Sequence, residues 1–514
     1  MDFPQVNQRR WWYVLLAVGL VLQVTAVMTS DLGLDAHVRL NVAMDEGDPG
    51  HDYPWGPTRH DADQSLTLTS SGEYDGYIGP WFVSELAVKI GALAGLLTLV
   101  ALAGVVPRWR HEDIGYYDPR WGALIAWSPP MIFATGRGYD EAFLAIFLGL
   151  CMVPLMLADA SKSSTRRLTY TLMATSVLLV LAWKGFGMGA GLLAFCGTLV
   201  VGWLWEFVDA KLSLQQSQPV TQRPWQMAFW ASSVTMVLLV VLSLTQFTGT
   251  LGVLGEYPVQ FSLAFVLAII DGVGIFILVG FCLWPFLRPL IQSGRNAVGH
   301  SITMVATFVS VLTVCVLFYI ASLWVLEAML WNASVFETAF LLGNNGRYLT
   351  LIILPLILMV HLLHQQAEPS IDFESSVDKR ALVVGLLLLV PFTLFTSLVG
   401  QQLWTEEAGV AMDGHLSENS TFFIVSEPSL AVHLMYSLKT QVDLTGEENI
   451  SAIWVDPSYA ASLLDEQRDI SYVLVAPDTS FTPSNSTLVD TGDAPSTFTQ
   501  SLTDSTWSIF RINF

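Results

Sequence analysis

The first residue that could do chemistry is an acidic side chain beside an apolar segment. Asp35 follows Trp11–Met28, which is about long enough to cross a bilayer, so its carboxylate should lie just outside the membrane. The residues after it predict an amphipathic surface helix, with Val38 and Leu40 on the apolar side and Arg39 on the polar side. A carboxylate held there could serve chemistry at the lipid–water boundary. The alternative is a solvated loop acid, because lone acidic residues are mostly exposed.

A second acidic site lies in a tight turn between two later apolar segments. The turn spans Gly136–Glu141 and contains Arg137, Asp140 and Glu141. Ionisable residues at membrane depth are costly and usually functional, although the cost is lower at the membrane rim. Asp140 could therefore belong to a functional site, or it could cap the helix that follows it.

Basic residues mark the same side of the predicted membrane. Arg137, Lys184 and Arg347 lie at the outer ends of apolar segments, and Lys89 lies inside the second segment. These positions depart from the usual bias of positive charge toward the cytoplasm. An anionic partner near the interface, such as a lipid phosphate, would explain them. Pairing with acids such as Asp140 is the other explanation, and the two can both hold.

The composition predicts an all-α polytopic membrane protein. Of the 514 residues, 53% are hydrophobic and only 13% are charged. The net charge of −21 argues against a nucleic-acid partner. Apolar segments near twenty residues long recur and predict about eleven membrane helices. These segments are Trp11–Met28, Phe82–Val106, Trp121–Ala134, Phe143–Leu157, Leu168–Trp183, Met188–Phe207, Trp225–Leu244, Val259–Trp284, Ile302–Leu326, Tyr348–Leu363 and Ala381–Leu403.

The connecting segments predict the orientation in the cell membrane. With a cytoplasmic N-terminus, most of the Lys and Arg residues between the apolar segments fall inside, as the positive-inside rule requires. The Asn-x-Ser/Thr triplets then all fall outside, which supports the same orientation. Their asparagines are Asn332, Asn419, Asn449 and Asn485. The loops on the outer face are long and the inner loops are short, so we expect the function on the outer face.

The chain changes character after residue 403. Residues 1–403 form the predicted transmembrane catalytic domain, which includes the outer loop 29–81, and residues 404–514 are polar and rich in Ser, Thr and Asp. Short β-type segments in the tail alternate with helical patterns, which predicts a small extracytoplasmic α/β domain. The predicted strands are Thr421–Val425, Ala452–Val455, Tyr472–Val475 and Ser508–Ile512, and the predicted helices are Ser429–Leu438 and Ser458–Glu466.

The first outer loop has a composition that could bind a metal ion. It contains His37, His51 and His60, together with acids that include Asp52, Asp61 and Asp63. Imidazole and carboxylate groups suit divalent ions, but the spacing is not that of a known metal motif. A divalent ion is therefore a possible cofactor to which we assign no ligands. All four cysteines lie in apolar segments, so we expect no disulfide framework.

Four stretches, taken in order, carry a resemblance to a known family. They are Asp35–Asp48, Ala123–Asp140 with its Ser-Pro and Arg, Leu181–Gly185, and Asn345–Leu349 with Pro355. Together they resemble the polyprenyl-phosphate-sugar-dependent glycosyltransferases of the GT-C superfamily, and the likeness is greatest to the branch of protein O-mannosyltransferases and lipid A aminoarabinose transferases. In two places the chain departs from the family's first motif: Ala36 replaces a Glu and Val38 replaces a Tyr. The Trp-Trp-Asp-Tyr-Gly box of oligosaccharyltransferases is absent from the sequence.

This resemblance implies an inverting transfer of a hexosyl or pentosyl group. The donor would be a sugar on a polyprenyl (dolichyl-type) monophosphate, and the acceptor a hydroxyl of a protein or lipid-linked glycan. By resemblance, Asp35 would be the general base, and Asp140 would either orient the acceptor or sugar or share a metal ion with Asp35. Lys184 and Arg347, and as a further candidate Arg137, would hold the phosphate. We predict that Asp35, Asp140, Lys184 and Arg347 converge near the membrane surface. The other expected substrate-binding residues are His37, Arg39, Arg137, Glu141 and Tyr348.

Two other classes of function stay open. A transporter or lipid flippase could use Asp271, Glu327 and Lys89, since ionisable residues inside a membrane can mark an ion path. Against this hypothesis, the sequence contains no clear inverted repeat. A receptor-like assembly subunit, with its tail as the working part, is the third hypothesis.

Overall fold

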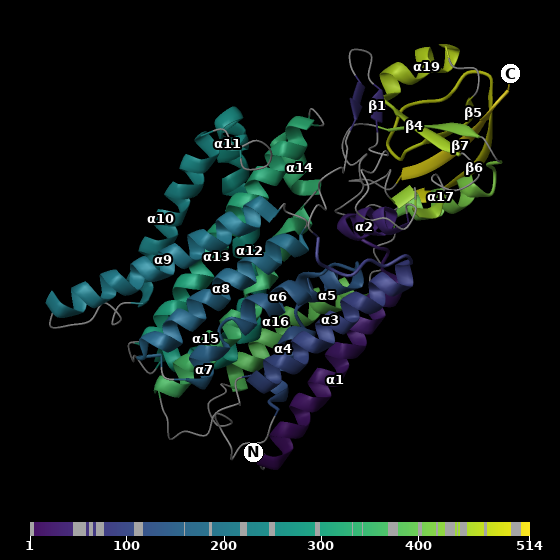
Figure 1. The fold of residues 1–514 in the computed structure, drawn as a ribbon. Helices are drawn as coiled ribbons and strands as arrows, with labels where there is room; N and C mark the ends of the chain where they lie inside the picture. Colours follow the sequence, from purple (N-terminus) through teal and green to yellow (C-terminus); the bar gives the residue numbers. More distant parts are fainter. Residues whose placement is uncertain are drawn as a thin grey trace.

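A bundle of long apolar helices forms most of the computed structural model (Figure 1). Seven of the described helices are long and apolar enough to cross a membrane, and a small α/β domain lies at one end of the bundle (Figure 1). The predicted fold class is confirmed. The structure describes residues 5–44, 58–60, 65–67, 77–106, 117–158, 160–184, 188–215, 224–245, 252–292, 299–330, 333–341, 343–367, 379–398, 403–417, 420–426, 437–438, 440–442, 450–466, 470–494 and 505–513.

Most of the predicted membrane segments correspond to one continuous helix each. Their continuity follows from long apolar sequences with few helix-breaking residues in their interiors. Eight helices are of this kind: α1 (Gln5–Thr29), α3 (Glu85–Val105), α8 (Ser163–Trp183), α9 (Met188–Gln215), α10 (Pro224–Leu244), α12 (Pro258–Gln292), α13 (His300–Leu330) and α16 (Lys379–Leu398). Two short helices, α11 (Val253–Glu256) and α14 (Val335–Leu341), lie between them in the sequence.

The other predicted segments are each broken into two pieces. Proline lacks the backbone N–H that a helix interior requires, and it lies at the start of α5 (Pro129–Gly136) and in the first turn of α7 (Val153–Leu157). The helices before these breaks are α4 (Pro119–Ala126) and α6 (Glu141–Leu150). The late segment divides into a 3₁₀ stretch, η4 (Gly343–Ile352), and α15 (Ile353–Ala367). The last of these breaks matters for the predicted site because Arg347 lies in η4.

Helix α2 (Leu34–Met44) lies between the bundle and the α/β domain (Figure 1). A helix is present where it was predicted, but it is not a surface helix, because His37 and Asn41 are buried as well as its apolar residues. Ala36 and Leu40 pack against Val88 of α3. The backbone N–H of Gly33 donates a hydrogen bond to the carbonyl of Arg137 at 2.9 Å, which fixes the start of the helix on the α5–α6 turn. Asp45–Asp48, the end of the predicted motif, lies outside the described residues.

The C-terminal domain contains a mixed sheet in the order β2-β1-β4-β3-β5-β7-β6. The predicted strands are present as β3 (Thr421–Val425), β4 (Ser451–Val455), β5 (Ile470–Val475) and β7 (Ser505–Ile512). Strand β6 (Ser486–Ala494) was not predicted, because it contains Asp and Gly residues, which are uncommon in strands, and lacks a regular alternation of apolar and polar residues. Helix α17 (Trp404–Asp413) comes before β3 in the sequence, and α19 (Pro457–Glu466) corresponds to the predicted helix Ser458–Glu466. Of the other predicted helix, Ser429–Leu438, residues 429–436 lie outside the described part.

The first outer loop contributes two strands to this sheet. Strand β1 (Thr58–His60) pairs with β2 (Ser65–Thr67) and runs parallel to β4, with Arg59 opposite Trp454. The predicted domain boundary includes this loop in the transmembrane domain, whereas these two strands extend the C-terminal sheet (Figure 1). The α/β domain is therefore tied to the bundle through the loop as well as through the chain after α16.

Candidate functional site

The carboxylate of Asp35 lies between two basic side chains from distant parts of the sequence. Its Oδ2 is 3.3 Å from Lys184 Nζ and 3.0 Å from Arg347 Nη2. Asp35 lies in the first turn of α2, Lys184 caps the C-terminus of α8, and Arg347 lies in η4. The structure thus brings together three of the four residues that were predicted to converge.

Arg347 is held rigidly from several sides. Its Nε donates to Glu141 Oε1 at 2.9 Å, and its guanidinium carbon lies 3.9 Å from the centre of the Tyr139 ring and 4.7 Å from that of Tyr348. Glu141 is fully buried and Arg347 is nearly so. Because a planar guanidinium can pair with carboxylates and stack on rings at once, these contacts fix its orientation. Arg347 therefore presents its Nη2 to Asp35 in a defined geometry.

Asp140, the fourth residue, joins the site through Arg39. Arg39 forms an ion pair with Asp140, and it donates from Nε to the backbone oxygen of Asp35 at 3.1 Å. The same guanidinium reaches Tyr77 Oη and the carbonyl of Gly138, each at 3.2 Å. Although Asp140 precedes α6, its side chain makes no capping hydrogen bond. The capping interpretation of this residue is therefore wrong. Asp140 does form an ion pair, but with Arg39 and not with the outer basic residues considered in the sequence.

The Asp35 carboxylate is the accessible part of a mostly buried group. The side chains of Asp35 and Lys184 are 29% and 21% exposed, whereas that of Arg347 is 4% exposed. Burial opposes ionisation of Asp35, but Lys184, Arg347 and Arg39 together outweigh it and hold its pKa well below the ordinary value. Asp35 is therefore a charged, partly open carboxylate at neutral pH.

The remaining predicted residues divide into two sets. Tyr348 belongs to the cluster: its hydroxyl accepts from Arg347 Nη2 at 3.3 Å, and Lys184 Nζ lies 5.1 Å from the centre of its ring. Arg137 contributes its backbone carbonyl to Gly33, while its guanidinium lies 5.1 Å from the ring centre of Phe133. No contact described for its side chain reaches Asp35.

His37 faces away from this cluster and toward the C-terminal domain. Residues two positions apart on a helix point to nearly opposite sides, so His37 cannot share the direction of Asp35. Its ring is buried, with Nδ1 lying 3.2 Å from Thr440 Oγ1 and Nε2 lying 3.4 Å from Glu406 Oε1. His37 therefore lies apart from the Asp35 cluster, and its role in substrate binding stays a prediction. His51, Asp52, Asp61 and Asp63 lie outside the described residues.

Two tyrosines of the site, Tyr139 and Tyr77, were not predicted from the sequence. Tyr139 lies in the Gly136–Glu141 turn, next to the predicted acids, so an aromatic platform for a nearby arginine could have been proposed there. Tyr77 comes from the far end of the long outer loop, where nothing in the sequence distinguishes it from its neighbours. It contacts Arg39 because the fold returns the loop to the start of α3.

Asp271 has a local partner that bears on the transporter hypothesis. This residue of α12 accepts a hydrogen bond from the backbone of Gly346, immediately before Arg347. A Cβ atom at Gly346 would lie 2.3 Å from Asp271 Oδ2, so only glycine allows this approach. Asp271 therefore supports the segment that carries Arg347, which gives it a role without an ion path.

Comparison with known proteins gives structural matches only. No family model and no curated protein matches the chain. Its fold is similar to that of ArnT from Cupriavidus metallidurans bound to undecaprenyl phosphate, with 12% identity and a TM-score of 0.30 over 97% of this chain and 98% of the other. The apo state of the same protein gives 12% identity and a TM-score of 0.29 over 98% of each chain. An assignment of function must therefore depend on the residues of the site.

Proposed function

We propose that this protein is a membrane glycosyltransferase that moves a sugar from a polyprenyl monophosphate to an acceptor hydroxyl, with inversion. One observation carries the proposal: the partly exposed Asp35 carboxylate shares its Oδ2 between Lys184 and Arg347. A carboxylate can accept the proton of a hydroxyl, and two cations can hold a phosphate. The site therefore places the two functions of such a transfer side by side.

The reaction balances with these groups alone. The acceptor oxygen forms a bond to the anomeric carbon while its proton passes to Asp35. The bond between that carbon and the phosphate oxygen breaks, and its electron pair remains on the phosphate. Lys184 and Arg347 stabilise the negative charge that grows there. Attack from the face opposite the leaving phosphate inverts the anomeric configuration.

The ion pairs of Asp35 also suggest how the base becomes active. While Lys184 and Arg347 hold its pKa low, Asp35 is a weak proton acceptor. A bound phosphate competes for the same two cations and so relaxes their hold on the carboxylate. The basicity of Asp35 then rises when the donor is in place, which couples proton transfer to donor binding.

The surroundings of the site fit a lipid-linked donor. The cluster is built from α2, η4 and the end of α8, at the end of the bundle that carries the α/β domain (Figure 1). The polyprenyl chain would remain among the apolar helices, and the phosphate would reach the charged cluster at the membrane surface. The acceptor, a protein or a lipid-linked glycan, would approach from the side of the α/β domain. With the cytoplasmic N-terminus that we propose, that side would lie outside the cell.

The test is sugar transfer or release from a radiolabelled polyprenyl-phosphate sugar by purified protein in lipid. The wild type is compared with Asp35→Asn, which preserves shape but cannot accept the proton, and with Asp465→Asn, an exposed control on α19. We expect Asp35→Asn to lose on the order of 10²–10⁴ in rate and the control to retain full activity. Because the donor sugar is unknown, a panel of hexose and pentose donors is required. Full activity of Asp35→Asn would refute the proposal.

A further inference from the structure

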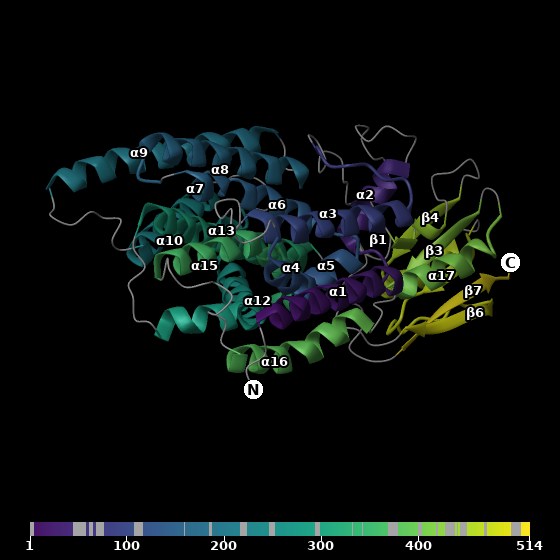
Figure 2. The same ribbon diagram turned by 90° about the horizontal axis from the view of Figure 1, so that it is seen from below.

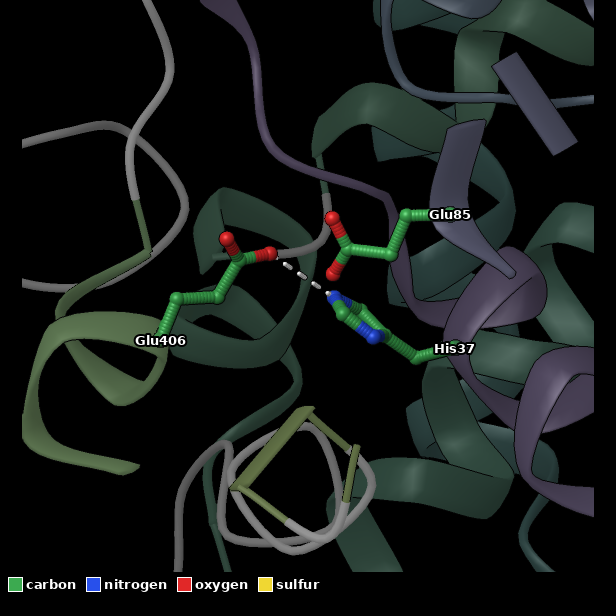
Figure 3. A group of neighbouring side chains, drawn as sticks. All are labelled: His37, Glu85 and Glu406. Carbon is green, nitrogen blue, oxygen red and sulfur yellow. Dashed lines mark ion pairs between the residues drawn. The ribbon is translucent and has the colours of Figure 1, made fainter. Parts of the chain in front are cut away.

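Three potential metal ligands meet between α2 and the C-terminal domain. They are His37 on α2, Glu85 in the first turn of α3, and Glu406 in the first turn of α17. One ligand atom from each lies within 4.8 Å of the others. Figure 3 shows the imidazole edge and both carboxylates turned toward a common point, with the ion pair of His37 and Glu406 dashed.

Two of these ligand atoms are buried and lack a hydrogen bond. The His37 ring is 1% exposed, and its Nε2 has no hydrogen-bond partner among the described residues. Glu406 Oε1 is likewise buried without one. The two atoms are 3.4 Å apart, but they do not form a hydrogen bond with each other. Buried polar atoms are normally paired, so this pair of free atoms calls for a partner.

The charge around these atoms is negative. The carboxylates of Glu85 and Glu406 both lie beside the His37 ring. Asp31 adds a third carboxylate beside Glu406, while Lys89 provides partial compensation.

Outer contacts hold the ligands in orientations suited to a metal ion. Thr440 Oγ1 lies 3.2 Å from His37 Nδ1 and accepts from Asn41 Nδ2 at 3.1 Å. With the ring proton on Nδ1, the lone pair of Nε2 points at the two carboxylates. Gln441 Nε2 donates to Glu85 Oε1 at 3.1 Å. Metal-binding histidines commonly use their second nitrogen in this way, and metal-binding carboxylates are also hydrogen-bonded.

We propose that His37, Glu85 and Glu406 form a divalent transition-metal site that joins α2 to the C-terminal domain. One imidazole and two carboxylates suit Zn²⁺ or Mn²⁺, whereas Ca²⁺ and Mg²⁺ prefer oxygen ligands alone. The site is separate from the Asp35 cluster, because His37 and Asp35 leave α2 in nearly opposite directions. It does not depend on the proposed glycosyl transfer.

The position of the site gives the metal ion a structural role. Glu406 lies two residues after the start of α17, and Thr440 and Gln441 come from the same domain. A bound ion would clamp this domain to the helix that carries Asp35 and Arg39. The energy of metal binding would then add to the stability of the docked domain, since an ion that binds only the docked form stabilises it.

The test is direct metal binding by full-length protein that carries no histidine tag. Protein stripped with EDTA is dialysed against Zn²⁺ or Mn²⁺, and bound metal is measured by mass spectrometry and calorimetry. The variants are His37→Asn and Glu406→Gln, which keep side-chain volume close to the original. His415→Asn is the matched control, a half-exposed histidine near Asp490 in the same domain. Size-exclusion chromatography checks that each variant is folded.

We expect the wild type and His415→Asn to bind one ion each and to gain thermal stability from it. In His37→Asn and Glu406→Gln the affinity should fall by at least about 10–100-fold, since even loss of an outer contact of a metal ligand has that effect. The thermal shift should disappear in both. If the wild type binds no ion, or if all four proteins bind equally, the proposal is overturned and His37 forms an ion pair only.

Discussion

Asp35 and Arg39 lie one helical turn apart on α2, and each pairs with an opposite charge from the bundle. Asp35 binds Lys184 and Arg347, while Arg39 binds Asp140. Arg39 Nε also donates to the backbone oxygen of Asp35 at 3.1 Å, so the two sets of ion pairs share one turn of helix. The position of the Asp35 carboxylate should therefore depend on the Arg39–Asp140 ion pair as well as on Lys184 and Arg347.

The first prediction concerns Arg39 and Asp140. Arg39→Ala leaves a buried carboxylate without its cation, and Asp140→Asn leaves the arginine without its anion, so each should lower activity by disordering the start of α2. Because both changes break one pair, the double variant should be about as active as the worse single variant. Steady-state kinetics on all four proteins completes the cycle. Independent, multiplying losses would show that the two residues act separately.

The second prediction concerns the shape of the Arg347 side chain. Lysine keeps the charge but cannot contact Asp35 and Glu141 together while stacking on Tyr139. We expect Arg347→Lys to lower kcat by about 10²–10³-fold, the usual effect of removing one charge-stabilising donor. Arg511→Lys on β7, an exposed site, should have no effect. An unchanged kcat in Arg347→Lys would mean that charge alone is sufficient.

The third prediction separates donor binding from chemistry. Lys184→Met removes a cation that we assign to the phosphate, so it should weaken binding of a polyprenyl phosphate and raise KM for the donor. Asp35→Asn removes the anion that occupies both cations, so it should bind the same lipid at least as well as wild type while turnover is lost. Equilibrium binding of a fluorescent polyprenyl phosphate measures both. Weaker binding by Asp35→Asn would contradict the assignment of the cations.

The charged residues of the site were easier to predict than the contacts that hold them in place. Lys184 and Arg347 stand out in the sequence because basic residues at the outer ends of apolar segments depart from the positive-inside bias, and the structure brings both to Asp35. The partners of Arg347 depend on a 3₁₀ segment and on Tyr139, which no hydrophobic period indicates. His37 could not be placed from the sequence, because only the direction of its side chain reveals that it contacts Thr440 and Glu406.

The sheet illustrates why long-range pairing escapes analysis of the sequence. β-branched and aromatic residues, which favour strands, made it possible to predict β3, β4, β5 and β7 from the sequence. Strand β1 is only three residues long, and its sequence, Thr58-Arg59-His60, has no apolar residue to mark a strand. Its pairing with β4 joins positions almost four hundred residues apart. Such a contact depends on the packing of the whole domain and not on local propensity.

The last prediction tests the contact that fixes the start of α2. Gly33 lies against Tyr139, and a Cβ atom there would come within 2.1 Å of the tyrosine ring. Gly33→Ala should therefore push Tyr139 from its place beneath Arg347 and cost about 1–3 kcal/mol of stability, as overpacking generally does. Its melting temperature and its activity should both fall, because Tyr139 orients Arg347.

Gly189 provides the matched control for this change. It lies in α9 with nothing within 4 Å of the position of a Cβ atom, so alanine there meets open space and favours the helix. Gly189→Ala should melt at or above the wild-type temperature and keep full activity. If Gly33→Ala were also unaffected, the start of α2 could move away from Tyr139 freely. The rigid placement of Asp35 opposite Arg347 would then have to come from the ion pairs alone.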